Sequence, residues 1–97
     1  MNEKPWPFDD PQNVAVFTVR SVWKERTPIL FVYHDEEDGA WQFHTEREPK
    51  EEEASIITLS EIVELDSSII EIADLPCGWC AWRSSVNDHP WQRQIKN

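Results

Sequence analysis

Two segments in the first half of the chain have the residue pattern of β-strands. Residues 14–19 (Val-Ala-Val-Phe-Thr-Val) and 29–34 (Ile-Leu-Phe-Val-Tyr-His) are rich in β-branched and aromatic residues and are apolar at both odd and even positions. This pattern favours strands that are covered on one or both faces. The charged segment 24–28, which ends in proline, predicts a turn between them.

The next segment predicts the second strand of a hairpin. An Asp-Gly pair directly precedes residues 40–44, and this pair is a strong signal for a hairpin turn. Residues 40–44 alternate between apolar and polar side chains, which places Trp41 and Phe43 on one face and Gln42 and His44 on the other.

Helical spacing replaces the strand pattern after a brief fourth apolar segment at 55–57. Thr58 and Glu61 have the spacing of a capping box, which predicts a helix start. The apolar positions at helical spacing are Leu59, Ile62, Val63, Ile70 and Ala73. The helical segment forms either one helix or two short ones, and a second capping-box pattern at 68–71 is where the second helix would begin. Pro76 ends the segment.

The last part of the chain predicts one more strand. Residues 79–83 (Trp-Cys-Ala-Trp-Arg) form this strand, and residues 87–90 form a turn before the tail that carries Trp91. We therefore expect an α+β fold, with an antiparallel four- to five-stranded sheet and one or two short helices on one face, as a two-layer sandwich. The pattern does not give the strand order.

The length predicts a single domain over residues 1–97. Within it, residues 1–12 are rich in proline and predict an extended N-terminal arm. Trp6 and Phe8 either dock this arm onto the body or leave it free as a recognition segment. Residues 46–54 form a predicted acidic loop.

Net charge narrows the range of partners. The chain has 19 acidic and 9 basic residues and a net charge of -10. Such a field repels nucleic acid and anionic membranes and favours a basic protein partner, although acidity also keeps a tryptophan-rich domain in solution. No apolar segment approaches the roughly 20 residues of a membrane span, and no secretory signal is visible. We therefore expect a cytoplasmic protein with reduced thiols.

Both cysteines belong to one C-x-x-C motif, formed by Cys77 and Cys80. This spacing is used in thiol-redox sites at helix N-termini and in zinc sites, but here it opens a predicted strand. Zinc needs two further ligands, and the histidines, His34, His44 and His89, lack zinc-site spacing, although His34 and His44 could meet across the hairpin. We expect two inert thiols, with a zinc or thiol-redox domain as the alternative.

No pattern for catalysis stands out. The carboxylates occur in charged runs that predict exposure, the serines lie in caps and turns, and the two glycines form no phosphate-binding loop. Residues 35–39 lack the residue order of a calcium loop. We therefore expect no enzymatic activity and no cofactor.

Tryptophan and charge supply the candidate binding residues. On a strand over 79–83, Trp79 and Trp82 point to opposite faces, so one of them packs in the core and the other lies on the far face of the sheet. There it either contacts a partner or is covered by the N-terminal arm or the Trp91 tail. Tryptophan and arginine dominate interface energetics, and acidic loops steer basic partners. The candidate partner-binding residues are Trp79, Trp82, Arg83, Trp91, Asp35, Glu36, Glu37 and Asp38.

Several segments together resemble a known family. They are Pro11-Gln12-Asn13-Val14-Ala15-Val16-Phe17-Thr18, Val32-Tyr33-His34-Asp35, Gly39-Ala40-Trp41-Gln42-Phe43, Leu59-x-Glu61-Ile62, Ala73-Asp74-Leu75-Pro76, Gly78-Trp79 and Ala81-Trp82-Arg83. Over about residues 11–92 the chain is similar to a family of uncharacterised small bacterial domains, related to predicted immunity proteins of polymorphic toxin systems. The resemblance implies a bacterial protein that neutralises a toxin by direct binding. It implies no catalytic residues, and its pattern does not fix Cys77 and Cys80 as cysteines.

Overall fold

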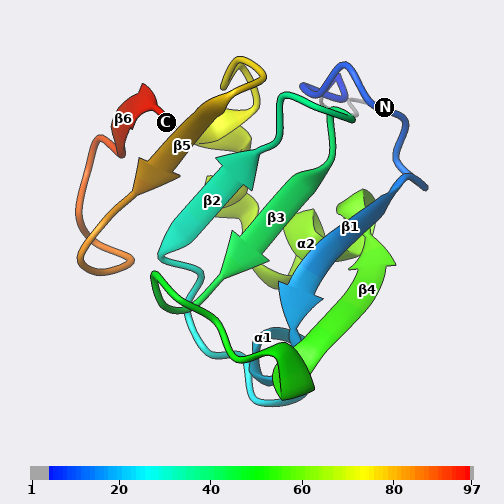
Figure 1. The fold of residues 1–97 in the computed structure, drawn as a ribbon, viewed down its shortest axis with the longest axis vertical. Coiled ribbons are helices and arrows are strands. Elements are labelled where there is room, and N and C mark those ends of the chain that lie inside the picture. The colour runs from blue at the N-terminus through cyan, green and yellow to red at the C-terminus, as the bar shows by residue number, and fades with distance from the viewer. Residues whose placement is uncertain (1–4, 97) are drawn as a thin grey trace.

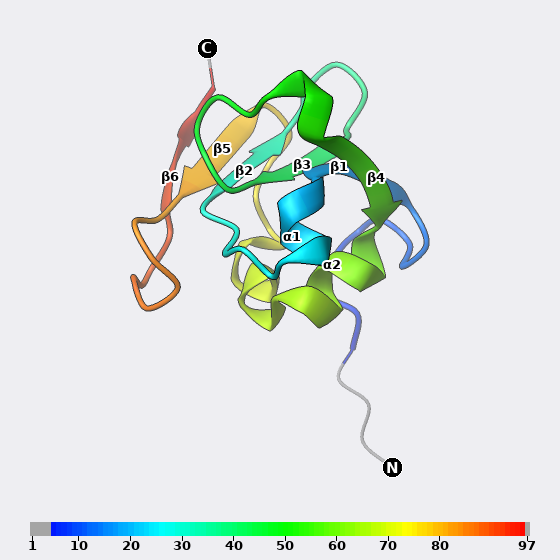
Figure 2. The same cartoon turned by 90° about the horizontal axis from the view of Figure 1, so that it is seen from below.

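The computed structural model describes residues 5–96 as one six-stranded sheet with its two α-helices packed on one face (Figure 1). The elements, in chain order, are β1 (Ala15–Val19), α1 (Arg20–Lys24), β2 (Phe31–His34), β3 (Trp41–His44), the 3₁₀ helix η1 (Glu51–Glu53), β4 (Ala54–Thr58), α2 (Leu59–Leu65), the 3₁₀ helix η2 (Ser67–Ile72), β5 (Trp79–Trp82) and β6 (Gln92–Ile95). Figure 2 shows α1 and α2 together beneath the sheet. Within the described residues, no helix is long and apolar enough to cross a membrane.

The predicted α+β class is confirmed, but the sheet has six strands instead of four or five, and it is mixed rather than purely antiparallel. The strand order is β4-β1-β3-β2-β5-β6. β1 and β3 run parallel, whereas every other pair is antiparallel. The β2–β3 hairpin lies against β1 as a unit, and this placement makes β3 parallel to it. The tail after Trp91 adds β6 as a sixth strand, although all four of its residues are exposed and only Ile95 is apolar, so they give no apolar pattern.

Strand register divides the side chains between two faces. Val32 lies opposite both Phe43 and Ala81, so these three share the face that the helices cover. Together with the apolar sides of α1, α2 and η2, this face builds the core. The buried apolar residues of this core are Phe8, Val16, Val19, Val22, Ile29, Val32, Trp41, Phe43, Leu59, Ile62, Ile69, Ile72, Leu75, Ala81 and Trp91. The other face carries none of α1, α2 and η2, and only the short η1 segment lies over part of it; we call it the open face (Figure 2).

The helical segment begins as predicted and divides into two. The Thr58 hydroxyl accepts a hydrogen bond from the Glu61 amide, while the Glu61 carboxylate accepts one from the Thr58 amide, so the capping box is confirmed. The division falls at Asp66, whose carboxylate accepts from the Ser68 amide and caps η2. This aspartate, rather than the predicted box at 68–71, begins the second helix.

The N-terminal segment is docked from Trp6 onward. Phe8 is buried and packs edge-to-face on Trp41, with ring centroids 5.4 Å apart. The indoles of Trp6 and Trp41 donate to the backbone carbonyl and the carboxylate of Asp10, at 2.6 and 2.9 Å. Residues 1–4 of the predicted arm lie outside the described residues. The predicted acidic loop 46–54 contains η1, and its last residue begins β4.

Arg83 joins the sheet to the helical layer. Its guanidinium donates two hydrogen bonds to the Ile29 carbonyl, at 3.1 and 2.9 Å. It also donates to the Ser68 hydroxyl and the Asp66 carboxylate, both at 2.8 Å, and lies 4.1 Å from the centre of the Trp91 ring. The side chain is fully buried, so every polar contact it makes is inside the protein. Arg83 and Trp91 therefore have structural roles, and both side chains are buried rather than presented to a partner; their contact with a partner stays a prediction.

We predict that Arg83→Met lowers the free energy of unfolding by about 3 kcal/mol or more, because it leaves the Asp66 carboxylate and the Ile29 carbonyl without their donor. Arg93→Met is the matched control, since Arg93 pairs with Asp74 at 2.9 Å where both side chains contact solvent. This control should lose less than about 1 kcal/mol. Urea unfolding followed by tryptophan fluorescence measures both values. Equal, small losses would contradict the structural role of Arg83.

Candidate functional site

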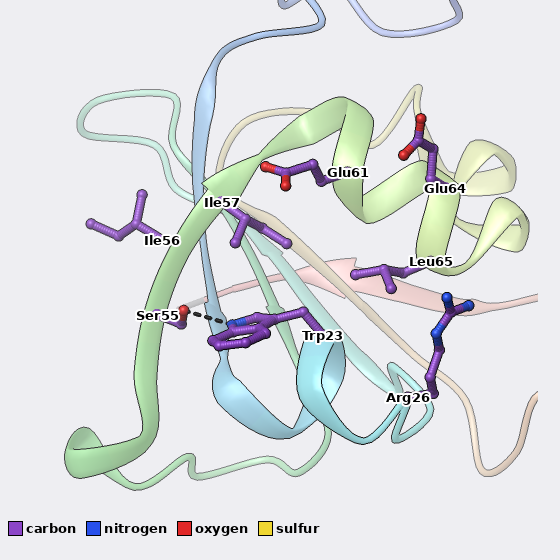
Figure 3. Close-up of a pocket in the computed structure, with 8 residues that line it drawn as sticks. All are labelled: Trp23, Arg26, Ser55, Ile56, Ile57, Glu61, Glu64 and Leu65. Carbon is purple, nitrogen blue, oxygen red and sulfur yellow. Dashed lines mark hydrogen bonds between the residues drawn. The ribbon is translucent and has the colours of Figure 1, made fainter.

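A groove of about 370 Å³ follows the outer edge of β4, between this strand, α1 and α2 (Figure 3). We call it the edge groove. Its lining residues are Trp23, Arg26, Ser55, Ile56, Ile57, Glu61, Glu64 and Leu65. The groove exists because β4 is the last strand on its side of the sheet, so nothing in the sheet lies beyond it.

Trp23 supplies the apolar surface of the edge groove. It lies on α1, whose Val22 packs into the core, so the neighbouring indole is directed outward and is 44% exposed. Its ring nitrogen donates to the Ser55 hydroxyl at 2.8 Å, which fixes the ring against β4. In Figure 3, Ile57 and Leu65 point into the same space from β4 and α2. An indole held in place loses little side-chain entropy on binding, and this favours a role in recognition.

Carboxylates from α2 form one rim of the groove. Glu61 is ionised, because hydrogen bonds from the Thr58 amide and hydroxyl lower the pKa of its carboxyl. Glu64 is exposed one turn further along α2, and Arg26 lies on the other side of the groove (Figure 3). Ile56 points away from the groove toward the open face, where it is 62% exposed. The sequence did not single out Trp23 or Ile56, since neither belongs to a motif.

The two strand tryptophans lie on opposite faces, as the strand alternation indicated. Trp79 lies opposite His34 and packs against the core. Trp82 lies opposite Phe31, which also lies opposite His44, so these three side chains share the open face. Both tryptophans are half-buried. Their contact with a partner stays a prediction, and the structure separates them from the edge groove by the width of the sheet.

The acidic residues 35–38 form the tip of the β2–β3 hairpin. Glu36, Glu37 and Asp38 are exposed there, and the Asp35 carboxylate accepts from the Gln42 amide at 2.7 Å and lies 3.9 Å from the Lys96 amine. The second acidic segment, 46–53, leaves the opposite end of β3. The two acidic segments therefore do not form one surface, and only the second one leads into β4.

The C-x-x-C cysteines have different surroundings. Cys80 is buried on β5, and this burial raises the pKa of its thiol. Cys77 is exposed, and its sulfur lies 3.5 Å from Nε2 of His34. Nδ1 of His34 lies 2.7 Å from the Leu75 carbonyl, which can only accept, so Nε2 is left as the acceptor for the thiol.

The proposed meeting of His34 and His44 across the hairpin does not occur. His34 lies opposite Trp41, whereas His44 lies opposite Phe31, so the two imidazoles are on different faces. Among residues 5–96, no group of three or more His, Cys, Asp or Glu side chains is arranged to hold a metal ion.

A smaller hollow of about 270 Å³ lies on the open face beneath residues 49–51. His44 lines it and is buried, and its Nε2 bonds to the Gln42 side-chain oxygen at 2.9 Å. Burial lowers the pKa of His44, so the imidazole is neutral at pH 7. Within the described part of the chain, Nδ1 of His44 has no hydrogen-bond partner. Phe17, Val19 and Pro49 give the hollow apolar walls, and Gln42, Lys50 and Glu51 also line it.

Comparisons with known proteins return no relative for this chain. No family model matches it, no curated protein is significantly similar, and no solved structure matches the fold. The functional assignment therefore depends on the geometry and charge described above.

We predict that only one of the two thiols reacts in the native protein. A neutral disulfide reagent, 4,4′-dithiodipyridine, should modify Cys77 quickly and Cys80 only as the chain unfolds, because β5 buries the second sulfur. Cys77→Ser should abolish the fast reaction, whereas Cys80→Ser should retain it. Two thiols that react at similar rates, or a bound equivalent of zinc that blocks both, would contradict this assignment.

Proposed function

We propose that this protein is a bacterial, immunity-like binding protein without catalytic activity, which engages a basic protein partner by direct contact. The net charge of -10 supports a basic partner, because complementary charge accelerates encounter and suppresses wrong partners. The resemblance to predicted immunity proteins agrees with this role and remains a resemblance.

The edge groove carries the proposal. It combines a fixed, exposed indole with the carboxylates of Glu61 and Glu64 beside an uncovered strand edge. Tryptophan in such a position is a typical anchor of a protein interface, and the carboxylates favour lysine or arginine next to it. Trp23 and Ile56 are exposed on the two sides of β4, and a partner that covers both would remove their apolar surface from water.

The hairpin tip has a different role in this proposal. Glu36, Glu37 and Asp38 lie beyond the far end of β3 and do not contact the groove. Their charge adds to the field that attracts a basic molecule, which is a long-range effect that salt weakens. Trp79 and Trp82 remain candidates for additional contacts.

A zinc or thiol-redox domain is the second candidate, and one observation favours it. The Cys77 thiol contacts an imidazole whose tautomer the Leu75 carbonyl fixes. However, His34 lies on the helix-covered face, while Cys80 shares the open face with Tyr33, its pairing partner. The contact therefore concerns one cysteine and does not use the C-x-x-C spacing.

We predict that Glu64→Lys weakens capture of the partner about tenfold, because it reverses a charge at the groove rim. Glu37→Lys is the matched control: it changes the net charge equally at the distant hairpin tip and should weaken binding only about twofold. The tagged protein is used at low ionic strength to capture partners from the source cell. The captured protein is identified by mass spectrometry, purified and titrated against each variant.

Two results would contradict the proposal. One is that the wild-type protein captures no basic protein. The other is that Glu64→Lys and Glu37→Lys weaken binding by the same factor, which would mean that net charge matters but the groove does not.

A further inference from the structure

β4 differs from the strand at the other edge of the sheet. Its five residues, Ala54–Thr58, are uncharged, and Ile56 at the centre is 62% exposed. β6, at the opposite edge, carries Arg93 and is followed by Lys96. Charged side chains on an edge discourage the addition of another strand, whereas an uncharged apolar edge permits it. The sheet is therefore protected at β6 and unprotected at β4.

The register shows which backbone groups of β4 face outward. The Leu59 amide donates to the Val14 carbonyl at 2.9 Å, directly beside the pair of Thr58 with Ala15. Because hydrogen-bonded pairs alternate in an antiparallel ladder, Ile57 and Ser55 also bond to β1. The amide and carbonyl of Ile56 consequently point away from β1, toward the free edge.

The neighbouring outward amides already have partners inside the chain. The Thr58 amide donates to the Glu61 carboxylate at 2.9 Å, in the capping box. The Ala54 amide donates to the Glu51 carbonyl at the end of η1. This leaves Ile56 as the position where a new strand would form a pair of backbone hydrogen bonds.

A strand added at Ile56 would have a surface for its side chains on both faces. On the helix side, its side chains would enter the edge groove and contact Trp23 and Leu65 (Figure 3). On the open side, they would cover Ile56. An extended peptide with alternating side chains satisfies both faces because successive residues of a strand point to opposite sides.

Charge identifies the occupant. Exposed carboxylates lie at both ends of β4: Glu51 and Glu52 before it, and Glu61 and Glu64 after it. A second copy of this chain paired antiparallel about Ile56 would bring these two acidic groups together, which is repulsive. A segment with lysine or arginine at its ends would instead pair with them.

We propose that an extended segment of the basic partner adds to the sheet as a seventh strand beside β4, with backbone hydrogen bonds to Ile56 and apolar side chains in the edge groove. This inference rests on the proposed function and specifies how the partner binds. On this inference, β4 recognises the backbone of the partner as well as its charge.

The experiment compares Ile56→Pro with Ile56→Ala. Both variants lose the isoleucine side chain, but only the first loses the outward amide, and proline is tolerated on an edge strand when its nitrogen faces solvent. The probe is a fluorescein-labelled peptide of alternating valine and threonine with two lysines at each end. We expect Ile56→Ala to weaken binding about threefold and Ile56→Pro to weaken it at least about tenfold more.

Modified peptides test the same contact without changing the protein. Methylation of the backbone nitrogens along one edge of the peptide should abolish binding, and methylation along the other edge should preserve it. The same peptide with glutamates in place of the lysines should not bind. Circular dichroism and thermal unfolding of Ile56→Pro verify that the variant keeps its fold.

Strand addition would be overturned if the two Ile56 variants bound the peptide equally, or if the peptides methylated on opposite edges bound equally. It would also be overturned if the lysine-ended peptide did not bind. A wild-type dimer through β4 in sedimentation would overturn it as well. If the captured basic partner binds Ile56→Pro and Ile56→Ala equally but is lost on Glu64→Lys, strand addition fails and the proposed function stands. If no basic protein binds the wild type, the proposed function itself fails.

Discussion

The buried guanidinium of Arg83 holds the two layers of this protein in a fixed relation. It connects the end of β5 to the Ile29 carbonyl before β2 and to Asp66 and Ser68 at the junction of α2 and η2. A buried charge without these partners would be costly, so the helices are confined to one position beneath the sheet. Trp91 covers the guanidinium and excludes water from it. The position of α2, and with it one wall of the edge groove, depends on this contact.

The edge groove follows from that arrangement. With α1 and α2 both beneath the β1–β4 side of the sheet, Trp23 is placed beside β4, and its hydrogen bond to Ser55 fixes the indole there. The capping box that begins α2 also occupies the Thr58 amide. The capping box that ends β4 therefore leaves Ile56 as the residue whose outward backbone groups are free. It also places the Glu61 carboxylate at the end of the same strand. A recognition role for this edge agrees with the charge of the whole chain.

The sequence was sufficient for features that depend on local chemistry. The hairpin at 35–40, the capping box at Thr58 and the opposite orientations of Trp79 and Trp82 follow from turn residues, spacing and strand alternation. Features that depend on distant contacts were not accessible. Arg83 was expected at the surface because its acceptors are an aspartate 17 residues away and a carbonyl 54 residues away. β6 forms through backbone pairing with β5, and Trp23 becomes important only because β4 lies next to it.

Amide hydrogen exchange along β4 tests the central claim most directly, because it reports whether the edge that the fold leaves open is open in solution. The account predicts that the Ile56 amide exchanges at nearly the rate of an unstructured peptide, while the Ser55 and Ile57 amides, which bond to β1, are strongly protected. Protection of Ile56 equal to that of Ile57 would contradict the account, because some other group would then cover the edge.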